Sequence, residues 1–480
     1  MELRQKTIIG LSWSFLDNFV TQTIAFVVNI ILARLLSPAE FGILGIITFF
    51  IAISSSFVDS GFGSALIRKK NCTPTDCSTV FYFSLVVSFI FYGLLFLIAP
   101  LAESFFNIPG LASILRVAGV VLIINATNAI PYTLMIKNID FKTKTKISIT
   151  SDTLAGVIAI IMAYNGFGIW SLVCRSLLGQ SFTTILLWVM NDWRPAFVFS
   201  LKSFKELFGF GYKLSLSGLV DTAYKNVYYP IIQKVFGSAT AGFYTMAEKY
   251  ANLFSATLTV NIQRVSFPVL STVQDNIQKL RWGHYKIIKS TMMISFALIF
   301  GLAAVAKPLI VILIGEDWLP CVPYLQLMCF SVMLYPLQAM NLNIIMISGK
   351  SNLLLKLEII KKTITIPFII VGIYLGVEVL LIGAIIISFI SYFLNSFYSS
   401  KLISYTSKDQ LRDILPFFVV SSIVSLFVWG FTFFEWNHWL TIILQVVIGT
   451  GLTIGAYEIM KQENYLEIKG IILRAVRKVC

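Results

Sequence analysis

Long apolar stretches alternate with short polar connections along almost the whole chain. Fourteen of these stretches are long enough to cross a bilayer as helices, which takes about 20 residues each. A backbone inside lipid must satisfy its own hydrogen bonds, so the pattern predicts an all-α integral membrane protein. The expected bands are 8–33, 41–66, 78–100, 114–136, 147–164, 167–190, 210–234, 241–269, 287–314, 320–348, 352–375, 378–400, 414–434 and 438–459.

The connections between these bands alternate between basic ones and ones nearly free of Lys and Arg. The basic segments are the N-terminus and the connections at 68–70, 137–146, 194–205, 279–289, 350–356 and 401–412, together with the C-terminal tail, and the connections that alternate with them are poor in Lys and Arg. Because basic loops remain in the cytoplasm, this alternation predicts a bacterial inner-membrane protein with both termini in the cytoplasm. The connections that lack Lys and Arg altogether are 101–113, 163–168, 315–319, 375–379 and 434–438.

The composition agrees with an integral membrane protein and excludes several classes of function. The chain is 57% hydrophobic and 12% charged, which excludes an ordinary soluble domain. The net charge of +14 is carried largely by the predicted cytoplasmic connections, where it serves topology and anionic headgroups, so no nucleic acid partner is expected. With two His, six scattered Cys and no motif of a hydrolase, metalloprotease or nucleotide-binding loop, the sequence predicts a protein that is not an enzyme and has no cofactor and no metal site.

An internal repeat of low identity relates residues 10–69 to residues 210–269 at an offset of 200. Residues 33–42 align with residues 233–242. Each copy of the repeat has a long helix, a short turn with one cation and a Gly, and another long helix. Six helices separate the copies, so both run in the same direction and the repeat is parallel. We expect two parallel six-helix lobes in a V around a central cavity, followed by two C-terminal helices. The expected boundaries are 1–190 and 210–400 for the lobes, 191–209 for a cytoplasmic inter-lobe linker, 401–460 for helices 13 and 14, and 461–480 for a cytoplasmic tail.

Several predicted membrane helices carry charges, which are costly in lipid unless they are paired or face water. Arg and Lys in a water-filled cavity would attract phosphate, and Tyr and Asn side chains suit sugars. The candidate pyrophosphate and sugar residues are Arg116, Arg175, Lys213, Lys225, Lys249, Arg264, Tyr224, Tyr228 and Asn252. An alternative stays open for Arg116 and Lys213, which lie near helix ends where a long side chain can extend to the interface.

Transport without a nucleotide-binding loop requires an ion gradient, the membrane potential or the substrate gradient. By their depth alone, the candidate proton or cation sites are Asp17, Asp59, Asp152 and Asp221. Structural pairing with nearby cations is an equal alternative, since Asp221 and Lys225 lie one helical turn apart.

Seven segments in chain order resemble one known family. They are ILARLLSPAEFGILGI at 31–46, VDSGFGSALIRKK at 58–70, GFGIWSLV at 166–173, DWRPAF at 192–197, GSATAGFYTMAEKY at 237–250, FPVLSTVQDN at 267–276 and GEDWLPCVPYLQLM at 315–328. They are similar to the Wzx-type polysaccharide transporters of the multidrug/oligosaccharidyl-lipid/polysaccharide (MOP) superfamily, most of all the colanic acid and teichuronic acid exporters.

This resemblance implies a flippase that moves undecaprenyl-pyrophosphate-linked oligosaccharide repeat units to the outer leaflet by alternating access. O-antigen, capsule or exopolysaccharide synthesis would use such a protein, with membrane lipids, a polysaccharide polymerase and glycosyltransferases as further partners. A cation-coupled multidrug antiporter and a lipid II flippase of the same superfamily remain alternatives. A membrane glycan polymerase is a third, although the short exterior connections disfavour its usual large catalytic loop.

Overall fold

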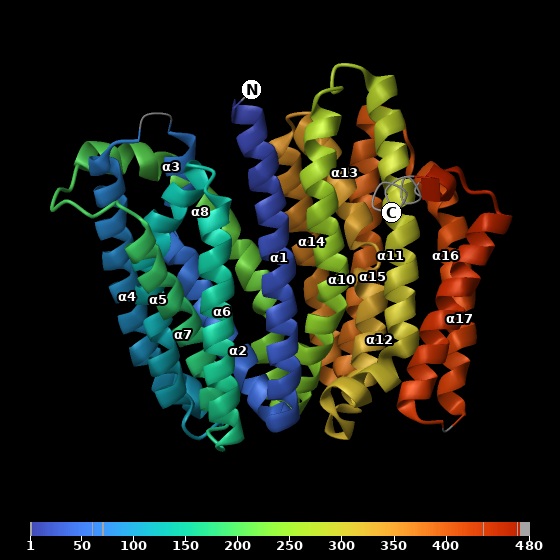
Figure 1. Cartoon of the computed structure of the whole chain (residues 1–480), viewed down its shortest axis with the longest axis horizontal. Coiled ribbons are helices and arrows are strands. Elements are labelled where there is room, and N and C mark those ends of the chain that lie inside the picture. The colour runs from blue at the N-terminus through green and yellow to red at the C-terminus, as the bar shows by residue number, and fades with distance from the viewer. Residues whose placement is uncertain (1, 60, 70–71, 435, 468, 471–480) are drawn as a thin grey trace. The chain divides into compact units, whose positions relative to one another are not determined.

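The computed structural model describes residues 2–59, 61–69, 72–434, 436–467 and 469–470, and all regular secondary structure in them is helical (Figure 1). The helices of the first half are α1 (Glu2–Leu35), α2 (Pro38–Asp59), α3 (Phe62–Arg68), α4 (Pro74–Phe106), α5 (Leu111–Lys137), α6 (Phe141–Tyr164), α7 (Ile169–Met190), α8 (Leu201–Asn226) and α9 (Tyr228–Phe236). Those of the second half are α10 (Ser238–Ser271), α11 (Ile277–Ile314), η1 (Glu316–Trp318), α12 (Cys321–Val332), α13 (Tyr335–Ile347), α14 (Ser351–Leu375), α15 (Val377–Ile403), α16 (Ser407–Trp429), η2 (Gly430–Phe433) and α17 (His438–Ile459).

Eleven helical segments in the described part of the chain are long and apolar enough to cross a membrane, which confirms a multi-pass membrane protein. The three other expected bands, 210–234, 241–269 and 352–375, are also helical and belong to α8 with α9, to α10 and to α14. These helices carry more charged and polar side chains than their neighbours do. The exact number of fourteen membrane helices therefore stays a prediction.

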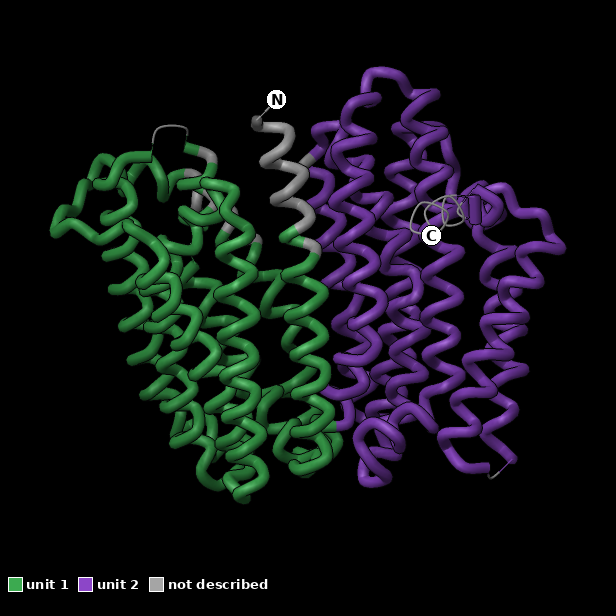
Figure 2. The backbone as a smooth tube through the Cα atoms, in the orientation of Figure 1, with its two compact units in different colours: residues 1–242 green, residues 243–480 purple. Residues whose placement is uncertain are grey.

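The chain divides into two compact units, residues 1–242 and residues 243–480 (Figure 2). The connection after α7 and the helices α8 and α9 belong to the first unit, in which α8 packs against α2, α3 and α4. The lobes and the linker inferred from the repeat stay predictions.

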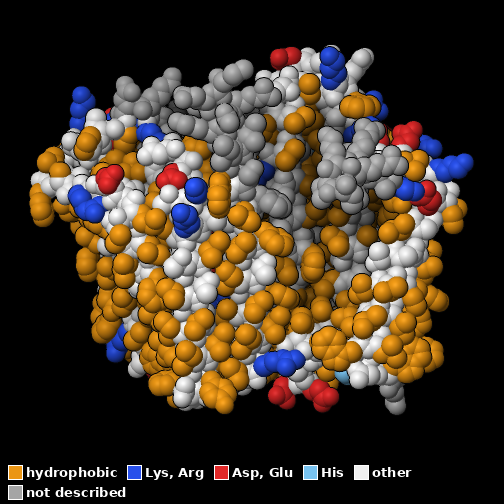
Figure 3. Space-filling model, viewed as in Figure 1, with side chains coloured by type: hydrophobic (Ala, Val, Ile, Leu, Met, Phe, Trp, Pro, Cys, Tyr) orange, Lys and Arg blue, Asp and Glu red, His pale blue; other side chains and the backbone are white. Residues whose placement is uncertain are grey.

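Unit 1 is held together by close packing of α4 on α5, α1 on α6 and α7 on both α5 and α6. One core cluster joins α2, α4 and α5 through Ile46, Ala99 and Leu115, all fully buried. The outer faces of these helices carry exposed apolar side chains, as expected for contact with lipid. Figure 3 shows hydrophobic side chains over the middle of the visible face, with most charged ones near the helix ends.

Helix ends in unit 1 are capped by their own sequence. At the start of α4, Thr73 and Asp76 form a reciprocal capping box, with hydrogen bonds of 3.2 and 3.0 Å. Before α5, the Glu103 carboxylate accepts hydrogen bonds from the backbone N–H groups of Gly110 and Ala112. These caps satisfy backbone groups that helix ends leave without partners.

Unit 2 is built around α11, which packs against α12, α16 and α17, while α14 packs on α15. Its interior includes a buried polar cluster. Asn341 of α13 donates a 3.0 Å hydrogen bond to Gln410 of α16 and accepts one of 2.5 Å from Ser399 of α15. The cluster links three helices by hydrogen bonds that lipid cannot replace.

Candidate functional site

A polar cavity of about 500 Å³ lies inside unit 1, near the ends of the helices that are predicted to face the cytoplasm. Its walls come from α2, α3, α4, α5, α6 and α7, so residues more than one hundred positions apart meet in it. The polar lining consists of Asp59, Ser84, Asn125, Asn128, Tyr132, Thr133, Ser148, Asp152, Gln180 and Thr183.

Two of the predicted coupling residues, Asp59 and Asp152, are brought together in this cavity. Asp59 is the last residue of α2, and Asp152 lies in the first half of α6. Both side chains are exposed in the cavity. Within the described part of the chain, neither carboxylate forms an ion pair or accepts a hydrogen bond, so both keep their full capacity to accept hydrogen bonds from a ligand.

Amide side chains add donors to the same cavity. Asn128 of α5 donates a 3.2 Å hydrogen bond to Thr184 of α7, which fixes its orientation. Asn125, one turn earlier, and Gln180 of α7 have no hydrogen-bond partner among the described residues. The cavity wall therefore presents free amide groups beside free carboxylates.

The other two predicted coupling residues are paired with lysines. Asp17 of α1 is 4% exposed and lies 2.6 Å from the Nζ atom of Lys144 in α6. Asp221 lies 2.7 Å from Lys225 one turn later in α8. Thus Asp17 and Asp221 already form ion pairs, whereas Asp59 and Asp152 form none within the described residues, although Asp152 interacts electrostatically with Arg175.

The predicted arginines of unit 1 contact neighbouring helices. Arg175 of α7 donates a 2.8 Å hydrogen bond to the Oδ1 atom of Asn29 in α1. Arg116 of α5 places its guanidinium 4.1 Å from the ring centroid of Phe96 in α4. Arg116 thus has the local cation–π partner that a snorkelling arginine finds.

The remaining predicted substrate residues lie on three helices. Tyr224 of α8 and Tyr228 of α9 are half-buried in unit 1, while Asn252 is half-buried in α10 of unit 2. Lys249 and Arg264 of α10 are exposed. The side chain of Lys213 lies outside the described residues. That these residues share one cavity stays a prediction.

A cavity of a different kind lies in unit 2. It measures about 680 Å³ and is mostly apolar, with walls from α11, α12 and α16 that include Phe300, Phe330 and Phe418. Polar chemistry in the described cavities is therefore concentrated in unit 1.

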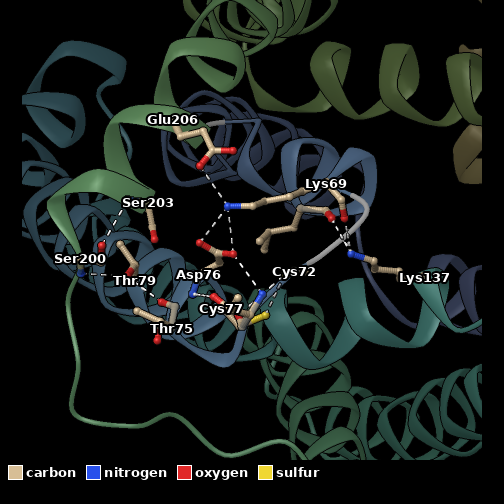
Figure 4. A network of polar contacts seen from close by, with 12 residues as sticks. Lys69, Cys72, Thr75, Asp76, Cys77, Thr79, Lys137, Ser200, Ser203 and Glu206 are labelled. Carbon is tan, nitrogen blue, oxygen red and sulfur yellow. Dashed lines mark hydrogen bonds and ion pairs between the residues drawn. The ribbon is translucent and has the colours of Figure 1, made fainter.

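A network of charged residues joins the start of α8 to the end of α3 and the start of α4 (Figure 4). The Nζ atom of Lys69 lies 3.1 Å from Asp76 at the start of α4 and 3.0 Å from Glu206 in α8. Burial alone would lower the pKa of Lys69, but the hydrogen bonds to Glu206 and Asp76 outweigh it and raise that pKa above its ordinary value. Lys137 of α5 donates to the backbone oxygens of Lys69 and Leu66, at 2.7 and 3.0 Å.

Two thiols lie beside this network. The Sγ atoms of Cys72 and Cys77 are 3.4 Å apart. A hydrogen bond from the Cys77 thiol stabilises the Cys72 thiolate and lowers the pKa of Cys72 to about 7. This pair was not expected from the sequence, in which the two cysteines are separated by four ordinary loop and helix residues.

Comparison with known proteins decides the family. Residues 31–323, more than half of the chain, match the model of a family described as polysaccharide biosynthesis protein. The chain belongs to this polysaccharide biosynthesis protein family. The resemblance to Wzx-type polysaccharide transporters seen in the sequence is thereby confirmed.

Relatives of similar length support the family assignment. The chain is 25% identical over 492 residues to a Klebsiella pneumoniae protein named as an uncharacterized membrane protein in the cps region, with all of both chains covered. It is also 25% identical to the lipopolysaccharide biosynthesis protein WzxC of Escherichia coli strain K12, with 87% of this chain and 86% of that one covered.

The fold of this family member also matches a solved structure. An inward closed conformation of the lipid II flippase MurJ superposes with a TM-score of 0.74 at 14% identity, covering 94% of this chain and 100% of that one. At this identity the match establishes the fold alone.

Proposed function

We propose that this protein is a transporter that flips lipid-linked oligosaccharide repeat units across the bacterial inner membrane. The observation that carries the proposal is the family match over residues 31–323, joined to a relative that is named as a lipopolysaccharide biosynthesis protein and covered to 86% of its length. The eleven helical segments of the described chain that are long and apolar enough to cross a membrane, together with the MurJ-like fold, agree with transport of a lipid-anchored substrate.

In this proposal the substrate is an undecaprenyl-pyrophosphate-linked repeat unit that moves from the cytoplasmic to the outer leaflet. Its prenyl chain remains in lipid while the pyrophosphate and sugars cross through the protein by alternating access. Binding shifts the conformational equilibrium only as far as the substrate binds the inward-open and outward-open states differently. Both termini are cytoplasmic in this orientation, as the basic connections predict.

The cationic residues are proposed to meet the pyrophosphate. A guanidinium binds phosphate oxygens in pairs, and Arg175 and Arg264 are the arginines farthest from predicted helix ends. Arg175 is half-buried and held by Asn29, which orients its guanidinium without neutralising it. Lys225 is paired with Asp221, so its charge is partly compensated before substrate arrives.

Coupling to a cation gradient stays part of the proposal. Of the four acidic candidates, Asp59 and Asp152 are exposed in the cavity and form no ion pair or hydrogen bond among the described residues, and they are therefore the better candidates. Asp17, locked to Lys144, fits a structural role.

The proposal is tested by deleting the gene and following the lipid-linked repeat units. We expect them to accumulate facing the cytoplasm, and expression of the wild-type chain to restore export. An unchanged pool together with loss of the surface glycan would contradict a flippase and favour a polymerase. Increased drug sensitivity with normal surface glycan would favour a multidrug antiporter, and loss of peptidoglycan precursor export would favour lipid II as the substrate.

A further inference from the structure

We propose that the polar cavity of unit 1 binds sugar residues of the substrate through their hydroxyl groups. The inference rests on the proposed function and deepens it, because it assigns the sugars to a site separate from the residues proposed for the pyrophosphate. The cavity lies wholly within unit 1, between α2, α4, α5, α6 and α7 with α3 at its edge.

The hydrogen-bonding groups of the cavity complement a sugar. Each sugar hydroxyl both donates and accepts, so it needs acceptors and donors close together. Asp59 and Asp152 supply acceptors, and the amides of Asn125 and Gln180 supply both. These four side chains have no hydrogen-bond partner in the described part of the chain, so a ligand would not have to break protein contacts to bind them.

The charge of the cavity argues against phosphate. No Lys or Arg lies among the described residues that line it, whereas two carboxylates do. Arg175 does not line the cavity and donates to Asn29 of α1, but it interacts electrostatically with Asp152 and so compensates part of the charge of that carboxylate. Lys144, which lies 5.7 Å from the ring centroid of Tyr132 at the cavity wall, is paired with Asp17. The two carboxylates of the lining would repel a pyrophosphate, but they would not repel an uncharged or amino-bearing sugar.

The size of the cavity argues against a bare metal ion as its only occupant. A volume of about 500 Å³ compares with about 30 Å³ for each water in the liquid. A cation such as Ca²⁺ requires six to eight oxygens at about 2.3–2.6 Å, a far smaller space. The volume instead falls within the range of about 300–1,000 Å³ that is typical of sites for small organic molecules.

The aromatic ring of Tyr132 adds an apolar surface to this polar lining. Tyr132 is 38% exposed although it lies in a membrane-spanning helix, and it lines the cavity. A flat ring beside amides and carboxylates suits a sugar, which has apolar C–H faces between its hydroxyl groups. Ser148 of α6 and Thr183 of α7 add hydroxyl groups to the lining.

The test measures binding of two lipids to the full chain in lipid nanodiscs. The first probe is undecaprenyl pyrophosphate without sugar, and the second is the lipid-linked repeat unit isolated from the host membrane. We expect the variant carrying Asn125→Leu and Gln180→Leu to bind the repeat unit about tenfold more weakly or worse, and undecaprenyl pyrophosphate as the wild type does. Both substitutions keep side-chain size approximately while removing the amide groups that could bond to a sugar. The matched control, Asn165→Leu at the opposite end of α6, is expected to bind both lipids normally.

Equal binding of the repeat unit by the double variant and the wild type would overturn the inference and leave the proposed function standing. Failure of the wild type to bind either lipid, with an unchanged pool of repeat units in the deletion strain, would instead overturn the proposed function. If Asp59→Asn and Asp152→Asn change the pH or Na⁺ dependence of flipping while the double variant binds the repeat unit normally, the cavity is a cation site and the inference is wrong.

A second measurement keeps the inference testable if the double variant fails to fold. Thr183→Cys places a thiol on the cavity wall, where a water-soluble maleimide can label it. We expect the repeat unit to slow this labelling, read at that site by mass spectrometry, and undecaprenyl pyrophosphate to leave the rate unchanged. Equal labelling rates with both lipids would overturn the inference.

Discussion

Gly42 of α2 and Gly242 of α10 make a reciprocal backbone contact. A Cβ atom on Gly42 would lie 2.0 Å from the carbonyl oxygen of Ser238, and one on Gly242 would lie 1.8 Å from that of Pro38. The two contacts repeat each other at the offset of 200 residues that the sequence predicted. Only glycine allows the two backbones to approach this closely.

Replacing either glycine by alanine should destabilise the protein. We expect Gly42→Ala and Gly242→Ala each to cost about 1–3 kcal/mol, the usual range for overpacking, because backbone atoms must move to admit the new carbon. Thermal unfolding of the purified protein in detergent measures the effect. The control is Gly218→Ala in α8, where a Cβ would meet no atom within 4 Å and helix propensity alone should leave stability unchanged or slightly raised. Equal unfolding temperatures for all three variants would contradict the contact.

Breaking the buried ion pair between α1 and α6 should be costly. Lys144→Met would leave Asp17, with a side chain 6% exposed, without its cation, and we expect a loss of about 3–5 kcal/mol. The double variant Lys144→Met with Asp17→Leu should recover much of that loss, since it removes the stranded charge as well. A double-mutant cycle on unfolding free energy tests this. Glu458→Gln, which breaks an exposed pair with Lys469, should leave the unfolding temperature unchanged.

The thiol pair predicts a pH-dependent reactivity. Because the pKa of Cys72 is lowered to about 7, its thiolate forms as the pH rises through 7, and alkylation by iodoacetamide should reach half its maximal rate there. Cys77→Ala removes the stabilising hydrogen bond, so the midpoint should move up toward the ordinary value of 9.0. Site-specific mass spectrometry gives the rate at Cys72. An identical pH profile for the two proteins would rule out the proposed cause.

Lys69 should hold the start of α8 against α4. In Lys69→Met the contacts to Asp76 and Glu206 are lost, and we expect backbone amides at 200–209 to exchange hydrogen about tenfold faster. Hydrogen–deuterium exchange measures this segment directly. Lys202→Met, which changes an exposed residue of the same helix, serves as the control and should exchange at the wild-type rate. Unchanged exchange in Lys69→Met would show that apolar packing alone holds the segment.

Much of the fold was predictable because a backbone that crosses lipid must satisfy its own hydrogen bonds, which favours helices. Hydrophobic length located the helices, including α8, α10 and α14, whose polar residues take them outside the composition typical of a membrane span. The repeat predicted that Gly42 and Gly242 correspond. It could not predict that they touch, since an alignment carries no distance.

The candidate site was predictable only in part. Depth in the membrane drew attention to Asp59 and Asp152, but their shared cavity depends on how α2 and α6 pack. Asn125 and Gln180 were missed because amides in membrane helices often serve helix packing. The spacing of Asn125, Asn128 and Tyr132 on one helical face was the signal that could have found them.

The reciprocal contact between Gly42 and Gly242 also bears on how such a chain arose. In a symmetric homodimer, residue i of one copy touches j of the other and j touches i, which is the pattern that Gly42 and Gly242 show with Ser238 and Pro38. In a homodimer of a half-length ancestor, a single glycine in each copy would have made both contacts. Gene duplication and fusion would then have inherited a working interface, after which each copy was free to acquire its own charges.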